Sequence, residues 1–184
     1  MADSISVKQK LMSDESILSQ IELVAKKMIE SYQAGGKTMF AGNGGSAADA
    51  QHFAAELVNR FCLDRDGVPA LALTTDSSVL TSIANDYDFN VLFSRQLRAL
   101  GNAGDVFVGI STSGTSANII EAVRVCREKH IFSVGLTGST GGKMASECDV
   151  CICVPSTVTA RIQEAHILIG HILCGLVEDS LFKK

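Results

Sequence analysis

Several hydroxyl side chains crowd into one short segment near the middle of the chain. The segment is Ser111-Thr112-Ser113-Gly114-Thr115-Ser116, which follows an apolar run over 106–110 and precedes a helical pattern that starts at 117. A turn from strand to helix exposes unpaired N–H groups, and the helix dipole there favours an anion. One hydroxyl would be explained as a helix cap, but this many exceed what a cap needs. The segment therefore predicts a phosphate-binding loop.

A second loop of the same kind lies after the first apolar run. It reads Gly42-Asn43-Gly44-Gly45-Ser46 and opens a helical pattern. Its glycines permit positive φ and close approach of a ligand, and Ser46 can cap the helix or donate to an anion. The loop has neither the Walker A nor the G-x-G-x-x-G spacing, so a nucleotide site is not indicated. An ordinary Gly-rich turn between a strand and a helix is the alternative.

The helical pattern after this loop carries groups that can move protons or bind a metal. His52 and Glu56 lie at i and i+4, so both project from one helix face, and Arg60 continues the same stripe. Imidazole and carboxylate groups suit acid–base work and zinc ligation. The alternative is a solvated face with ion pairs between neighbouring turns.

The last helical pattern brings a second set of donors. His171 lies inside an apolar run over 167–176, where a polar side chain needs a partner, and Gln163 precedes it on the same helix. A satisfied core histidine is the alternative for one such residue. Two donors on each of two helices favour a joint site, and His52, Glu56, Gln163 and His171 can together bind a divalent ion or divide acid and base roles.

Short apolar runs alternate with helical patterns along the chain. Strands are predicted over 37–41, 69–73, 106–110, 132–136 and 150–154, and helices over about 16–34, 46–62, 77–84, 117–129, 143–147 and 159–179. This alternation predicts an α/β doubly wound parallel sheet with an N-terminal helix and a long C-terminal helix. Ligands bind at the carboxyl ends of the strands in such sheets, which is where both loops fall.

Composition narrows the class of protein. The chain has 184 residues, a net charge of −4 and 46% hydrophobic residues. We expect one domain over 1–184, no nucleic-acid partner, no membrane span and no signal peptide, and hence a cytoplasmic protein. The six cysteines do not complete a structural zinc motif and are predicted to be buried free thiols.

Four segments together resemble the sugar isomerase (SIS) domain family, and within it the bacterial phosphoheptose isomerases. They are AGNGGSAADAQHFAAE (41–56), IAND (83–86), GDVFVGISTSG (104–114) and RIQEAH (161–166) with the helix that continues to His171. The resemblance covers nearly the whole chain and implies a SIS-type, flavodoxin-like sandwich. It further implies isomerisation of sedoheptulose 7-phosphate to D-glycero-D-manno-heptose 7-phosphate through an enediol, the first step towards activated heptose for lipopolysaccharide or capsule.

The resemblance also implies roles for individual residues. Glu56 matches the general base and His171 the general acid. Positions that match zinc ligands, one zinc per subunit, are His52, Glu56, Gln163 and His171. Positions that match contacts to the sugar and its phosphate are Asn43, Gly44, Gly45, Ser46, Arg60, Asn85, Asp86, Ser111, Thr112, Ser113, Ser116 and Gln163. The family forms homotetramers with active sites shared between subunits, so a neighbouring chain can contribute Arg60 and His171.

The main alternative function is that of a SIS-domain protein that binds a partner and has no catalytic activity. The SIS scaffold also serves as a binding protein associated with the replication initiator, which shares the helix segments but lacks the carboxylate and imidazole that match Glu56 and His171. Both residues are present here. A sugar-phosphate-sensing regulator would carry a fused helix-turn-helix domain, for which the chain has no room. The isomerase is therefore the favoured function.

Overall fold

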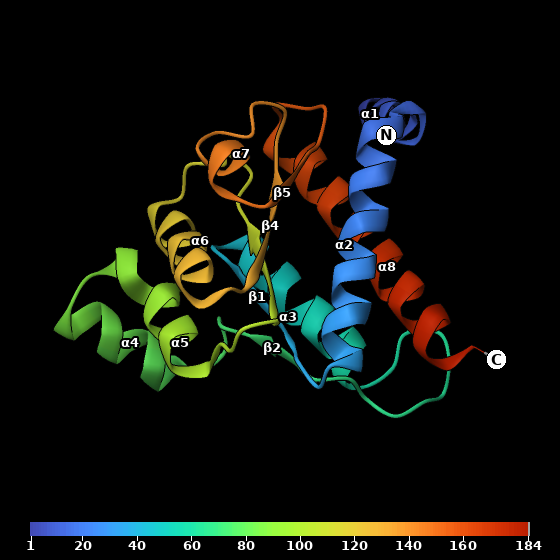
Figure 1. Ribbon diagram of the computed structural model, residues 1–184. Coiled ribbons are helices and arrows are strands. Elements are labelled where there is room, and N and C mark those ends of the chain that lie inside the picture. Colours follow the sequence, from blue (N-terminus) through green and yellow to red (C-terminus); the bar gives the residue numbers. More distant parts are fainter. Residues whose placement is uncertain (184) are drawn as a thin grey trace.

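Five parallel strands form the centre of the structure, a computed structural model that describes residues 1–183 (Figure 1). The strands are β1 (Thr38–Gly42), β2 (Ala70–Ala72), β3 (Val106–Ile110), β4 (Phe132–Thr137) and β5 (Val150–Cys153), in the order β2-β1-β3-β4-β5. This is the flavodoxin-like order, so the predicted doubly wound parallel sheet is confirmed. Thr38 pairs with Val106 and Gly42 with Ile110, which brings the carboxyl ends of β1 and β3 side by side.

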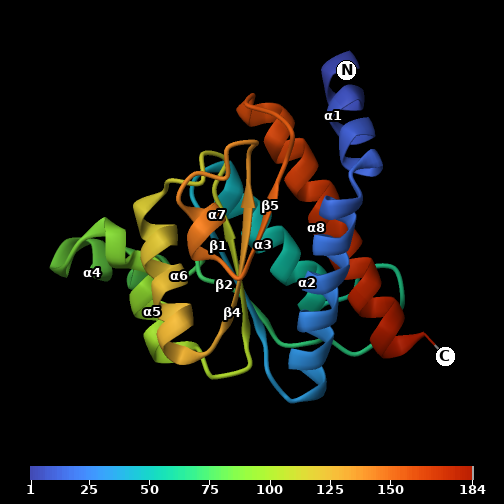
Figure 2. The same ribbon diagram turned by 45° about the horizontal axis from the view of Figure 1, so that its top comes forward.

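Helices cover both faces of the sheet, as the two views in Figures 1 and 2 show. On one face lie α1 (Ala2–Ser13), α2 (Glu15–Gln33), α3 (Gly45–Val58) and α8 (Thr159–Phe182). On the other lie α4 (Ser77–Asp86), the 3₁₀ turn η1 (Phe89–Val91), α5 (Leu92–Leu100), α6 (Ala117–Lys129) and α7 (Met144–Glu147). The predicted N-terminal and long C-terminal helices are present.

The strands have few polar residues because both of their faces are buried. Phe40 packs into the core beneath α2, α3 and α8, whereas its neighbours Met39 and Ala41 pack into the core beneath α5 and α6. All residues of β1 and β3 are buried. Strands enclosed by helices on both sides read as continuous apolar runs, which is how the sequence revealed them.

Two helices and a 3₁₀ turn were not predicted. Helix α1 buries only Val7 and Leu11, so its sequence has little of the apolar periodicity that marks a helix. Helix α5 is short and follows η1 directly, and its buried residues include Phe93 and Leu97. The buried positions of α5 recur at helical spacing, so the sequence carried a periodic signal for this helix that the prediction did not use.

Helix α3 differs from the prediction at both ends. It begins at Gly45 with Gly44 as its N-cap, at a φ of 58°, so Ser46 does not cap it. It ends at Val58 rather than near residue 62, because the Arg65 guanidinium donates to the carbonyl oxygens of Glu56, Leu57 and Asn59. Arg60 therefore lies beyond the helix, and the expectation that it continues the helical stripe is wrong.

The six cysteines are free, as predicted, but they are not all buried. Cys126 and Cys174 are buried, and burial raises the pKa of the Cys174 thiol to about 12. Cys62 is exposed, because it lies in the loop that begins where α3 ends, and three others are half-buried. The prediction of buried thiols throughout is therefore wrong for Cys62.

Helix α8 is long and apolar enough to cross a membrane by length and composition alone, with a mean hydropathy of 1.4. The core helix of a soluble protein passes the same test. Here α8 packs against α1, α2, α3 and β4, and 44% of its most apolar window is buried inside the chain. We interpret it as a core helix on these contacts.

Candidate active site

The two loops singled out in the sequence meet at the carboxyl edge of the sheet. Asn43 follows β1, and Asn118 lies in the first turn of α6, after the hydroxyl-rich segment. Their side-chain amides exchange two hydrogen bonds, with Asn43 Nδ2 donating at 3.0 Å and Asn118 Nδ2 donating at 2.8 Å. This reciprocal pair fixes the glycine loop beside the hydroxyl-rich turn. Sequence reasoning missed Asn118, although its place in a first helical turn was a signal.

The hydroxyls of the hydroxyl-rich loop (111–116) bond to one another rather than to the helix. Ser111 Oγ lies 2.8 Å from Ser116 Oγ and 3.4 Å from Ser113 Oγ, and the Thr115 hydroxyl donates to Ser113 Oγ at 2.9 Å. Ser116 precedes α6, yet its side chain makes no capping bond. The helix-cap alternative therefore does not describe these hydroxyls. Their contact with a phosphate, together with that of Thr112, stays a prediction.

Glycines let neighbouring segments approach these loops closely. Gly114 has a φ of 66°, and a Cβ there would lie 2.1 Å from the Gly141 carbonyl oxygen. At Gly45 a Cβ would lie 2.4 Å from Gln163 Nε2, so the absence of a side chain makes room for Gln163 of α8. Ser46 is buried next to it. Gln163 thus lies at the start of α3, beside the glycine loop.

Farther along helices α3 and α8, three polar side chains converge. His52 and Glu56 project from one face of α3, with His52 Nε2 3.2 Å from Glu56 Oε1. His171 of α8 reaches the same point, and its Nε2 lies 2.8 Å from His52 Nε2. A solvated helix face explains the pair on α3 but not the histidine that joins it from another helix. The Phe61 ring packs on the His171 ring at 5.5 Å between centroids.

These three side chains have the donors of a zinc site. Their ligand atoms all lie within 4.8 Å of one another, as two imidazole nitrogens and one carboxylate oxygen. Ligand atoms around a tetrahedral zinc are about 3.3 Å apart, so small side-chain movements would let all three bind one ion. Gln163 lies eight residues before His171, about 12 Å along the helix, so it does not join this group within one chain. Its role as a ligand stays a prediction.

The buried histidine of α8 is His166, not His171. His166 is fully buried, with Nε2 3.1 Å from the Thr137 carbonyl oxygen. Burial lowers its pKa to about 4, so it is neutral near pH 7. His166 is therefore the core histidine of α8, with no hydrogen-bond partner for its buried Nδ1 among the described residues, whereas His171 is half-buried and faces His52.

Two of the residues predicted at the sugar site lie apart from the histidines. Asn85 and Asp86 end α4, where both are exposed and Asn85 Nδ2 donates to Asp86 Oδ1 at 2.8 Å. Helix α4 and helix α8 lie on opposite sides of the molecule in both ribbon views. Arg60 is exposed in the loop after α3. A single chain does not bring these residues together, and their roles stay predictions.

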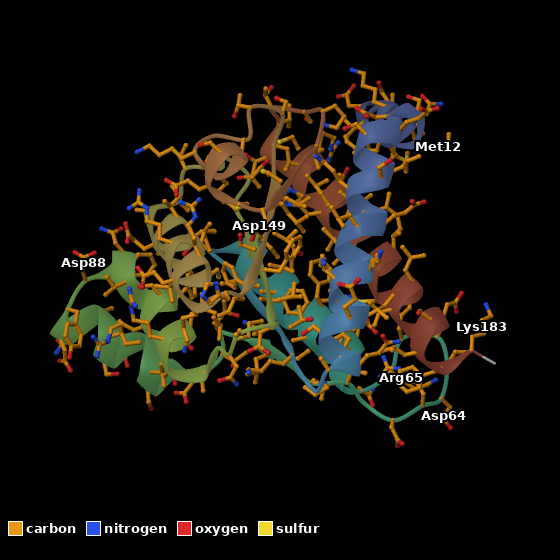
Figure 3. All side chains as sticks on the ribbon, viewed as in Figure 1. Met12, Asp64, Arg65, Asp88, Asp149 and Lys183 are labelled. Atoms are coloured by element: carbon orange, nitrogen blue, oxygen red, sulfur yellow. The ribbon has the colours of Figure 1, made fainter. Side chains whose placement is uncertain are left out.

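Sequence reasoning also missed a buried ion pair near the end of α8. Arg65 Nε lies 3.0 Å from Glu178 Oε1, and both side chains are almost fully buried. Figure 3 labels Arg65 in the loop beneath the C-terminal part of α8, far from Asp88 on the other side of the molecule. Glu178 follows the apolar run that drew attention to His171, so the same signal could have revealed it.

Comparison with known proteins finds close relatives over the full length. The model of the SIS domain family matches residues 4–138. A phosphoheptose isomerase of Aneurinibacillus thermoaerophilus is 62% identical over 180 residues, covering 98% of this chain and 91% of that protein. Phosphoheptose isomerase 2 of Campylobacter jejuni is 56% identical, covering 100% and 91%. The solved structure of a phosphoheptose isomerase from Neisseria gonorrhoeae superposes with a TM-score of 0.91 at 48% identity, covering 97% and 94%.

Proposed function

The chain belongs to the SIS domain family and, within it, to the phosphoheptose isomerases, and on that premise we propose that it converts sedoheptulose 7-phosphate to D-glycero-D-manno-heptose 7-phosphate. The observation that carries the proposal is the convergence of His52, Glu56 and His171 in a chain that is similar to these enzymes over its full length. The product is the type of sugar that is activated for lipopolysaccharide or capsule.

The proposed reaction moves one proton between neighbouring carbons and another between their oxygens. Glu56 removes a proton from C1 of the ketose, which forms the enediol, and its carboxyl exchanges that proton with solvent before it protonates C2 to give the aldose. His171 carries the proton between O1 and O2, so no net proton is gained or lost. The short His52–His171 contact holds both imidazoles at the carboxylate, which supports this division of roles.

The hydroxyl-rich loop is the proposed grip on the phosphate. Ser111, Ser113 and Ser116 lie in one cluster of mutual hydrogen bonds, and a phosphate oxygen can take the place of those contacts. The loop lies at the start of α6, where the helix dipole adds to the attraction. Binding the phosphate, which does not react, would hold the reacting carbons in place and so contribute to turnover.

Zinc is the cofactor that the donor set fits best, at up to one ion per chain. His52, Glu56 and His171 would hold it, with Gln163 as the fourth ligand that the family resemblance implies. A bound zinc ion would polarise the substrate oxygens that gain charge in the enediol. Elemental analysis after purification in zinc should find up to one ion per chain. Full activity in metal-free protein would contradict a catalytic zinc.

The distance between the two parts of the site supports an oligomer with shared active sites. Helix α3 runs from the loop edge at Gly45 to Glu56, which is about 16 Å along its axis. Because Asn43 and Asn118 join the glycine loop to the hydroxyl-rich turn, one chain places the proposed phosphate loop about three helical turns from its own Glu56. We propose a homotetramer in which Gln163, Arg60, Asn85 and Asp86 complete sites formed with neighbouring chains. The free cysteines support a cytoplasmic location, where thiols stay reduced.

The direct test is conversion of the substrate. Purified protein is incubated with sedoheptulose 7-phosphate, with and without added zinc, and the aldoheptose phosphate is measured by ¹H NMR from its anomeric proton at C1, which the ketose lacks. We expect the aldose to accumulate to equilibrium. A lack of conversion under both conditions would favour the binding protein associated with a replication initiator.

A further inference from the structure

Helices α3 and α8 are joined by a second polar contact, about two helical turns beyond His171. Its centre is Glu178, whose side chain is 1% exposed. The carboxylate accepts hydrogen bonds from three successive backbone N–H groups, those of Phe61 at 3.0 Å, Cys62 at 2.7 Å and Leu63 at 2.9 Å. Glu178 therefore holds the start of the loop that follows α3.

Arg65 connects this carboxylate to the last turn of α3. Its Nε donates to Glu178 Oε1 at 3.0 Å, and its side chain is 4% exposed. Its Nη2 donates to the Glu56 carbonyl oxygen at 3.0 Å, and its Nη1 donates to that of Leu57 at 2.8 Å. These carbonyls have no partner within a helix that ends there; Arg65 supplies a donor to both, and the Val68 N–H supplies a second one to Leu57 at 3.0 Å.

Both proposed catalytic residues, Glu56 and His171, are connected to this ion pair through direct contacts or through one intervening residue. The backbone of Glu56 is bound by Arg65 directly. The ring of His171 packs on the ring of Phe61, and the N–H of Phe61 is bound by Glu178. A change in the ion pair would therefore shift the carboxylate on α3 and the imidazole on α8 relative to each other.

We infer that Glu178 and Arg65 are positioning residues, which set the separation of Glu56 and His171 for the isomerisation. The inference rests on the proposed function. A buried ion pair is a weak means of stabilising a fold, because apolar residues of similar volume often do as well. The ion pair, unlike an apolar pair, binds three loop N–H groups and two helix carbonyls at once. These hydrogen bonds are what hold the two proposed catalytic side chains in place.

The chain offers a matched control for a purely structural role. Asp105 is also 1% exposed, accepts N–H bonds from Lys37 at 3.0 Å and Asn102 at 2.8 Å, and pairs with Lys37 Nζ at 2.6 Å. It precedes β3, and within the described residues its side-chain carboxylate bonds only to Lys37 and Asn102, neither of which forms a hydrogen bond or ion pair with His52, Glu56 or His171. Loss of either carboxylate removes a buried, fully bonded charge, but only Glu178 is connected to the proposed site.

The test compares Glu178→Gln with Asp105→Asn in the full-length protein. Both variants should lose stability, but Glu178→Gln should also lower kcat by about tenfold to a hundredfold, with KM changed by less than about twofold. Asp105→Asn should keep kcat within about twofold. The ¹H–¹⁵N spectra of the imidazoles give a readout without substrate, and the His171 signals should move only in Glu178→Gln.

The outcomes separate this inference from the proposed function. Active wild type with unchanged kcat and His171 signals in Glu178→Gln would overturn the inference. Inactive wild type would overturn the proposed function, and with it the assignment of Glu178 as a positioning residue for isomerisation. If Glu178→Gln does not fold, Arg65→Lys decides in the same way, because it keeps the charge but loses the bonds to the Glu56 and Leu57 carbonyls.

Discussion

Helices α3 and α8 meet at two polar contacts that differ in how well their groups are partnered. At the Arg65–Glu178 pair the side chains are 4% and 1% exposed, and the carboxylate accepts bonds from three N–H groups and the guanidinium. At the contact of α3 with His171, the side chains of His52 and Glu56 are 45% and 25% exposed. Within the described residues, the side chain of His52 contacts Glu56 and His171. Lone pairs that the fold does not use are available for protons, metal or substrate. The Arg65–Glu178 pair therefore holds the structure around the candidate site, and the contact of His52, Glu56 and His171 keeps the lone pairs that the proposed chemistry needs.

The largest expected effect comes from breaking the contact of His52, Glu56 and His171. Glu56→Gln and His171→Gln should each lower turnover by about 10²- to 10⁴-fold, because each removes a group that transfers a proton. Folding should stay intact, since both side chains are only half-buried. Steady-state kinetics and thermal unfolding measure the two quantities, with Glu30→Gln on α2 as an exposed control. Turnover near that of the wild type in either variant would remove that residue from the mechanism.

Breaking the Arg65–Glu178 pair should have a large effect on stability, in addition to its effect on turnover. Glu178→Leu leaves the Arg65 charge and three loop N–H groups buried without their acceptor, so it should cost about 3–5 kcal/mol in urea unfolding. His52→Leu, on the same pair of helices but half exposed, should change stability by less than about 1 kcal/mol. Equal losses in the two variants would show that the contacts do not differ as described.

A smaller effect is expected at the phosphate loop. Ser113→Ala removes one hydroxyl donor from a charged ligand, which should raise KM by about tenfold with little change in kcat. Ser139→Ala, in the neighbouring loop, serves as the control because it changes a hydroxyl that is not among the proposed phosphate contacts. An unchanged KM in Ser113→Ala would argue against the phosphate cradle.

The smallest effect is a difference in how stability depends on pH. Burial by itself raises the pKa of Glu178, but hydrogen bonds from Leu63, Cys62, Phe61 and Arg65 outweigh it and hold the pKa below the ordinary 4.5. A lowered carboxyl pKa contributes stability that is complete above pH 4.5 and is lost as the pH falls through the folded value. The stability advantage of wild type over Glu178→Gln should therefore shrink below that pH. Urea unfolding at a series of pH values measures it, and a constant difference would contradict the proposed ionic contact.

The sheet was predictable because its signal is local. Strands enclosed on both faces need continuous apolar runs, and each such run in the sequence became a strand. The end of α3 was not predictable, because Arg65 stops it from outside the helix with a side chain that must first be placed by Glu178, far away in the sequence. Helix α1 was missed because it buries too few residues to show periodicity.

The candidate site also combines local patterns, which the sequence reveals, with contacts between distant residues, which it does not. The hydroxyl-rich turn was visible as a local pattern and lies where a parallel sheet places its ligands. The contact between His52 and His171 joins residues 119 apart, and the sequence indicated it only through the types of the donors. The ion pair of Arg65 and Glu178 was indicated only by a charged residue at the end of an apolar run, because neither residue belongs to a chemical motif. Residues that a neighbouring chain would contribute in the proposed homotetramer leave no trace in the geometry of one chain.

Deuterium transfer from solvent tests the central claim, that Glu56 and His171 form the reacting contact, most directly. The wild type, Glu56→Gln and Asp105→Asn are incubated with sedoheptulose 7-phosphate in D₂O, and deuterium at C2 of the aldose is followed by NMR. The account predicts labelled aldose from the wild type and Asp105→Asn and almost none from Glu56→Gln. Labelling by Glu56→Gln at the rate of the wild type would contradict it.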